Sequence, residues 1–230
     1  MKTKHQYLLL FYWAILFIDC FLIYSQHEQY RVVTKTLLMP LLLLYYLANS
    51  SRKHHLPSKT LTAIALLLAW AGDVSLLMEG EIFFIVGLVL FLLMHLIYII
   101  YFWRIQSLLP VRDGLYFFLP LFLVAVFDVL VMIKVVPQAG DLGIPLIAYM
   151  IVISLMFVIA FNILSSKKAR SLATNFFIPG AAMFLVSDAI LGLNMFIWED
   201  QMIGIAVMLT YGYAQHLMVH GFIKHIRGRV

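Results

Sequence analysis

Four aspartates lie inside long apolar stretches of the chain: Asp19, Asp73, Asp128 and Asp188. A carboxylate in the middle of a lipid bilayer costs at least about 2.5–3.5 kcal/mol, so it usually faces the protein interior and marks a proton, ion or substrate site. Asp73 and Asp188 lie in similar local sequences, GDVSL and SDAIL. Two like carboxylates that share a proton in a dry site supply a general acid and a general base together. The pair Asp73 and Asp188 is therefore the candidate catalytic pair.

Each of the charged residues in the apolar stretches also has a structural interpretation. Each aspartate of the catalytic pair could instead hold the helices together, through Lys35 or through hydrogen bonds. Lys35 is expected to form an ion pair with Asp19, or to bind an anionic head group together with Arg31. For Asp128 the structural interpretation is preferred.

Two further pairs of polar residues are expected to line the site. His95 and Tyr98 share one helical face with Gly87, a residue that permits close helix approach. Tyr211 and Gln215 are four residues apart and also share a face, where their polar ends would position a water or a carboxyl group. The structural alternative for His95 is hydrogen-bonded packing.

The composition defines the elements that must position these residues. The chain has 230 residues, of which 64% are hydrophobic and only 12% charged, whereas soluble domains are about 45–50% apolar and about 25% charged. A membrane span needs about 20 apolar residues, and continuous rather than alternating apolar runs favour helices over barrel strands. The sequence therefore predicts an all-α, polytopic membrane helix bundle, a single transmembrane domain over residues 1–230. The eight transmembrane helices are expected at residues 7–25, 31–48, 60–78, 82–103, 114–135, 143–164, 174–197 and 201–223.

Basic residues gather in alternate connections between these spans, and acidic residues gather in the others. The positive-inside rule then places both termini in the cytoplasm, in agreement with an even number of spans. The net charge of +5 is explained by these loops and does not indicate nucleic-acid binding. We expect a multi-pass integral protein of the bacterial cytoplasmic membrane.

Five motifs together carry a resemblance to a known family: Lys35–Pro40, Ala71–Leu77, Gly87–Tyr98, Phe184–Leu191 and Tyr211–Gln215. With them the chain resembles the YhhN-like lysoplasmalogenases, eight-span membrane hydrolases. Thr36 follows Lys35 where many relatives have proline. The resemblance implies hydrolysis of the vinyl ether bond of a lysoplasmalogen, or of a related ether lysolipid, to a fatty aldehyde and glycerophospho-ethanolamine or -choline.

In this interpretation Asp73 and Asp188 act as acid and base, without an assignment of which is which. Lys35 holds the phosphate of the lysophospholipid, while His95, Tyr98, Tyr211 and Gln215 line the site or orient its reacting groups. Membrane lipid is the other expected partner, and neither a metal nor an organic cofactor is required.

The leading alternative is a proton-coupled transporter or channel, because such proteins also use intramembrane carboxylates. A metal hydrolase that uses Asp73, Asp188 and His95, and a non-catalytic lipid-binding scaffold, are the remaining alternatives. Head-group preference, chain length and oligomeric state are left open by the sequence.

Overall fold

The computed structural model describes residues 5–50, 56–105 and 114–228. Within these ranges the chain forms helices and turns and contains no strand, so the prediction of an all-helical fold is confirmed. Each of the predicted spans corresponds to one long helix. These are α1 (Gln6–Tyr24), α2 (Arg31–Asn49), α3 (Leu56–Ser75), α4 (Glu81–Ile105), α5 (Leu115–Val135), α6 (Gly143–Asn162), α8 (Ile178–Leu193) and α9 (Ile203–Ile226).

One shift from the predicted boundaries is in α3, which begins at Leu56 rather than at residue 60. Pro57 lies in the first turn of this helix, where a residue without a backbone N–H is tolerated because no helical partner is needed there. Lys59 and its polar neighbours lower the apolar signal of this turn, so hydropathy alone placed the start of the helix too late.

The segment before α8 is irregular. A short helix, α7 (Arg170–Leu172), leads into a π-helical turn at Ala173–Phe177, and Pro179 then lies in the first turn of α8. Proline cannot donate a helical hydrogen bond, and π-turns are one of the usual ways in which a helix absorbs such an interruption. Gly180 follows directly, and a Cβ at this position would lie 3.3 Å from Cβ of Leu217 in α9.

Six of the described helical segments are long and apolar enough to cross a membrane. They contain α1, α2, α4, α5, α6 and α8. The other two long helices, α3 and α9, carry more polar side chains, among them Asp73 in α3 and Gln215 in α9. The protein is therefore a multi-pass membrane helix bundle, while the full set of eight spans and the cytoplasmic placement of both termini stay predictions.

The chain divides into two compact units. Of the described residues, the first unit contains those up to Tyr98 and those from Val219 onward, and the second contains those from Ile99 to Met218. The division falls inside α4 and α9. Whether the units form the single transmembrane domain expected from the sequence stays a prediction.

In the first unit, α2 packs against both α1 and α3. The end of α9 is fastened to the end of α2, because Arg227 donates hydrogen bonds to the backbone oxygen and the side-chain Oδ1 of Asn49, at 2.7 and 2.9 Å. One turn before Asn49 in α2, the hydroxyl of Tyr45 lies 3.4 Å from Nδ1 of His220 in α9. Tyrosine rings fill much of the core of this unit, and Tyr12, Tyr45, Tyr46 and Tyr98 are fully buried.

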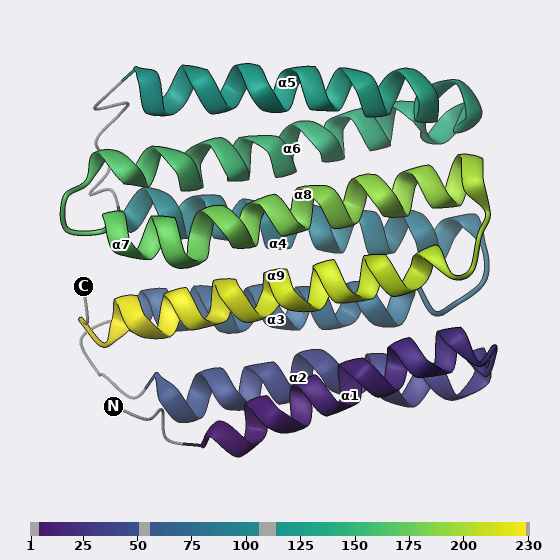
Figure 1. Cartoon of the computed structure of the whole chain (residues 1–230), viewed down its shortest axis with the longest axis horizontal. Coiled ribbons are helices and arrows are strands. Elements are labelled where there is room, and N and C mark those ends of the chain that lie inside the picture. Colours follow the sequence, from purple (N-terminus) through teal and green to yellow (C-terminus); the bar gives the residue numbers. More distant parts are fainter. Residues whose placement is uncertain (1–4, 51–55, 106–113, 229–230) are drawn as a thin grey trace. The chain divides into compact units, whose positions relative to one another are not determined.

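In the second unit, α6 packs against α5 and α8, and α5 also contacts α8. Figure 1 shows these three helices running alongside one another in teal and green. The buried side of α6 includes Tyr149, Ile153 and Ser154, which face the neighbouring helices. Two of these three residues carry hydroxyl groups, and both of them contact aspartates.

Candidate functional site

Asp73 lies near the end of α3 and is almost completely buried. Two glycines bring α3 and α4 close together beside it. A Cβ at Gly72 would lie 2.9 Å from the ring of Phe91, and a Cβ at Gly87 would lie 2.9 Å from the side chain of Leu76. Contacts this short exclude larger residues unless a neighbour moves, so the expectation that Gly87 permits close helix approach is confirmed.

Lys35 lies near Asp73 within the first unit. It is half-buried in the second turn of α2. Its ammonium group interacts electrostatically with both Asp73 and Asp19, more strongly with Asp73, and it is repelled by Arg31. Lys35 thus brings a positive charge to the aspartate that the sequence analysis assigned to catalysis.

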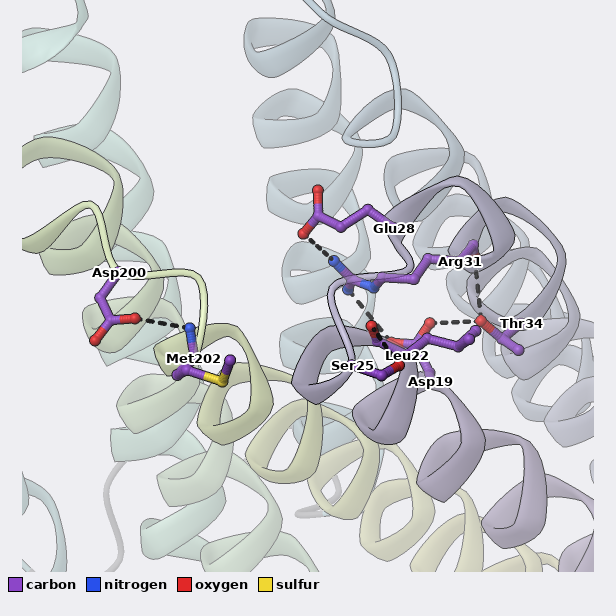
Figure 2. Close-up of polar contacts among 8 residues, drawn as sticks. All are labelled: Asp19, Leu22, Ser25, Glu28, Arg31, Thr34, Asp200 and Met202. Atoms are coloured by element: carbon purple, nitrogen blue, oxygen red, sulfur yellow. Dashed lines mark hydrogen bonds and ion pairs between the residues drawn. The ribbon is translucent and has the colours of Figure 1, made fainter.

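The predicted ion pair between Asp19 and Lys35 is wrong, because Asp19 is held by two other residues of α2 (Figure 2). Arg31 Nη2 donates to Asp19 Oδ2 at 3.3 Å, and Thr34 Oγ1 donates to Asp19 Oδ1 at 2.6 Å. Arg31 and Thr34 are three residues apart and share a face of the helix.

Arg31 is also paired with Glu28, at 3.6 Å between Nη1 and Oε1. Figure 2 shows its guanidinium group between the two carboxylates. Asp19 is fully buried and Glu28 is 55% exposed. This network fastens the α1–α2 hairpin, and it occupies Arg31, which the sequence analysis had considered as a partner of Lys35 in head-group binding.

His95 and Tyr98 are both fully buried in α4, within the first unit. Tyr12 of α1 is fully buried as well and interacts electrostatically with Tyr98 and with Asp73. The sequence analysis missed Tyr12. The available signal was its spacing of seven residues from Asp19, which places the two side chains on one face of α1.

In the second unit, Asp188 is half-buried in α8 and accepts a hydrogen bond from the phenol of Tyr149 in α6, at 2.5 Å. Its neighbour Ser187 donates to the backbone oxygen of Val207 in α9, at 3.1 Å. Tyr149 was also missed from sequence, because one tyrosine in an apolar helix carries no motif. Its hydroxyl fixes the position of a carboxylate that the sequence analysis assigned to catalysis.

Tyr211 and Gln215 are buried in α9 and also belong to the second unit. Gln215 Nε2 donates to the hydroxyl of Tyr211 at 3.5 Å, which confirms that they share a helical face. The ring of Tyr211 packs edge-on against Phe184 of α8, with centroids 5.9 Å apart. Phe184 lies one turn before Asp188 in α8.

Asp128 is half-buried in α5 and accepts hydrogen bonds from Ser154 of α6, at 3.0 and 2.8 Å to its two oxygens. The contact joins two neighbouring helices of the second unit. This geometry supports the structural interpretation of Asp128.

The predicted site residues are thus divided between the units. Asp73, Lys35, His95 and Tyr98 lie in the first unit, whereas Asp188, Tyr211 and Gln215 lie in the second. The pairing of the two aspartates stays a prediction. Among the residues that the structure describes, no group of three or more His, Cys, Asp or Glu side chains could hold a metal ion.

Comparison with known proteins gives a family for the chain. No curated protein and no solved structure matches it. The sequence pattern of the YhhN family matches residues 30–222, which is most of the chain and includes every predicted site residue. Asp19 lies outside the matched region, whereas Asp73, Asp128 and Asp188 lie inside it. The chain belongs to the YhhN family.

Proposed function

We propose that this protein is a membrane hydrolase that cleaves the vinyl ether bond of lysoplasmalogens, or of a related ether lysolipid. The observation that carries the proposal is that Asp73 and Asp188, two helix aspartates inside the YhhN-family region, each interact with a buried tyrosine. Tyr12 interacts with Asp73, and Tyr149 donates a hydrogen bond to Asp188. Intramembrane carboxylates in such polar settings are usually functional.

A vinyl ether is hydrolysed by protonation of its β-carbon, which leaves an oxocarbenium-type cation beside the ether oxygen. In the proposed mechanism one aspartate, protonated, delivers this proton. The other, ionised, stabilises the cation and accepts a proton from the water that attacks it. When the resulting hemiacetal breaks down, the second aspartate gives its proton to the leaving glycerol oxygen and the first takes the proton of the hemiacetal hydroxyl. This step releases the fatty aldehyde and the glycerophospho-alcohol and returns both aspartates to their starting state, with one water consumed. Glycosidases use two carboxylates against a similarly charged transition state.

The other residues bind and orient. Lys35 binds the phosphate of the lysolipid as a point charge close to Asp73. Tyr149 holds Asp188 in place, and the hydrogen-bonded Tyr211 and Gln215 orient the attacking water or a carboxyl group. His95 and Tyr98 form the buried polar lining on the Asp73 side. No residue role here requires a metal or an organic cofactor.

We further propose that both termini face the cytoplasm and that the protein resides in the bacterial cytoplasmic membrane. The charge distribution of the connections supports this orientation. Reporter fusions at each terminus, active only on one side of the membrane, test it.

The decisive experiment is aldehyde release by the purified protein from a lysoplasmenyl lipid in detergent, with no ion gradient. Wild-type protein is expected to release aldehyde, and Asp73→Asn and Asp188→Asn are each expected to lower turnover by about 10²-fold or more, the range of acid–base assistance. Asp128→Asn is the matched control, because it changes an aspartate in a membrane helix that serves helix packing. Size-exclusion chromatography and thermal unfolding establish that the variants fold.

Two results would overturn the proposal. Folded Asp73→Asn and Asp188→Asn proteins that both keep full turnover would refute the role of the aspartates. Absence of aldehyde release, together with gradient-driven uptake into proteoliposomes that depends on either aspartate, would instead favour a proton-coupled transporter.

A further inference from the structure

A surface groove runs between α2 and α3 in the first unit. Its volume is about 170 Å³. Leu67 and Trp70 on its α3 side are 49% and 39% exposed, so the groove opens onto the surface of the first unit. The lining is apolar apart from the indole nitrogen, and it consists of Met39, Pro40, Leu43, Leu66, Leu67 and Trp70.

A proline shapes this groove. Pro40 lies inside α2 and has no N–H to donate to the carbonyl of Thr36, its partner one turn earlier. The indole N–H of Trp70 donates to that carbonyl instead, at 3.0 Å. A side chain of α3 thus replaces the missing helical bond of α2, and this bond fixes the indole at the groove.

One end of the groove is charged. Lys35 precedes Met39 by one turn of α2, and Asp73 follows Trp70 by one turn of α3. These two charged groups interact with each other. At about 1.5 Å per residue, the distance along α2 from Lys35 to Leu43 is about 12 Å. Lys35 and Asp73 thus lie one turn beyond the apolar lining, at the same end of the groove.

We propose that this groove binds the hydrocarbon chain of a single-chain lysophospholipid, with the lipid phosphate at Lys35. The assignment of a lysophospholipid as the occupant rests on the proposed function. Lipid tails are as apolar as leucine side chains, so hydrophobicity alone does not draw a chain from the bilayer into such a groove. The positive charge of Lys35 supplies the missing preference, because it attracts an anionic phosphate to the end at which Asp73 lies. The vinyl ether, which joins the chain to the head group, is then held beside Asp73.

A photo-crosslinking experiment tests binding without relying on turnover. The probe is a lysophosphatidylethanolamine with an ordinary ester linkage and a diazirine in its chain, added to the purified protein in nanodiscs. Labelling is expected to concentrate on the groove residues of α2 and α3. An excess of unlabelled lysophosphatidylethanolamine is expected to reduce it, and the same excess of a diacyl phospholipid is not. Labelling spread evenly over the lipid-facing helices, or not reduced by the lysolipid, would overturn the proposal.

Matched variants make the test specific to the groove. Leu67→Trp fills the groove and is expected to lower labelling about tenfold, the size of a steric mismatch in an apolar pocket. Leu44→Trp is the control, because Leu44 is also exposed, at 53%, but lies outside the lining. Leu43→Phe is a milder filling variant if Leu67→Trp does not fold. Equal effects of the filling variants and of the control would contradict the proposal.

The same variants separate this inference from the proposed function. If the groove binds the chain, Leu67→Trp raises the KM for long-chain lysoplasmenyl lipids and leaves the KM for short-chain ones near the wild-type value. If the lysolipid reduces labelling but no aldehyde is released, the proposal that the groove binds the lipid chain stands and the proposed hydrolase activity is refuted. Aldehyde release without competed labelling would keep the hydrolase and refute the groove.

Discussion

Replacement of Arg31 by alanine is expected to destabilise the first unit more than its position near a helix end suggests. Asp19 is fully buried, and Arg31 is its ion-pair partner at 3.3 Å, with Arg31 itself only 16% exposed. Removal of one partner from a fully buried ion pair costs about 3–5 kcal/mol. Thr34 still donates to Asp19 in the variant, and water reaches the vacated space through the exposed side of Arg31. The expected loss of unfolding free energy for Arg31→Ala is therefore smaller, about 2–3 kcal/mol.

The reciprocal change is expected to cost less. Asp19→Asn keeps the size of the side chain and one oxygen that accepts the hydrogen bond of Thr34. Arg31 then retains Glu28 and its contact with water, so the loss is about 1 kcal/mol, close to one ordinary hydrogen bond. Because the two residues interact directly, the double variant should cost at least about 1 kcal/mol less than the sum of the single variants.

The assay is unfolding of the purified protein in mixed detergent and dodecyl sulfate micelles, applied to the wild type, both single variants and the double variant. Glu28→Gln is the control, because Glu28 is exposed and its contact with Arg31 is expected to contribute at most about 1 kcal/mol. A coupling energy below about 0.5 kcal/mol would refute the reasoning. So would a loss in Glu28→Gln as large as the loss in Arg31→Ala.

Two further predictions concern the second unit. Ser154→Ala removes the hydroxyl that donates hydrogen bonds to Asp128. It is expected to lower the unfolding free energy by about 1 kcal/mol, within the range measured for hydrogen bonds between membrane helices, and to leave turnover unchanged. A loss of turnover in the folded variant would contradict the structural role of Asp128. Tyr149→Phe removes a hydrogen bond to Asp188, which at about 1.5–3 kcal/mol for a charged acceptor corresponds to a fall in kcat of about 10- to 100-fold with little change in KM. An unchanged kcat, with reduced stability, would make Tyr149 a structural residue only.

The helices themselves were predictable from sequence because the bilayer demands long apolar segments, and few other arrangements satisfy that demand. Hydropathy reports how much apolar surface a segment has, but not where its first hydrogen-bonded turn lies. For that reason it missed the start of α3, where Pro57 is compatible with a helix and Lys59 is not apolar. The close approach at Gly87 was also predictable, because a glycine inside an apolar helix needs a reason to be there.

The partners of the buried charges were harder to predict. Depth along a helix follows from counting residues, and on that basis Lys35 seemed the natural partner of Asp19. Which way each helix faces depends on packing with all of its neighbours, and the actual rotation of α2 presents Arg31 and Thr34 to Asp19. The contact of Tyr149 with Asp188 could not be predicted for the same reason, because it depends on the rotation of both α6 and α8.

Asp19 and Asp128 differ from Asp73 in the way in which their charge is compensated. Asp19 and Asp128 are held by side chains of the next helix along the chain, and Asp19 lies outside the YhhN-family region. Such local compensation offsets the cost of burying a carboxylate, and it is sufficient to explain why these residues are present. Asp73 lies instead in α3, a helix that is less apolar than the six spanning segments, and it attracts the lysine at the mouth of the α2–α3 groove. Asparagine at Asp19 or Asp128 should therefore change stability before activity, whereas asparagine at Asp73 or Asp188 should change turnover in a protein that still folds.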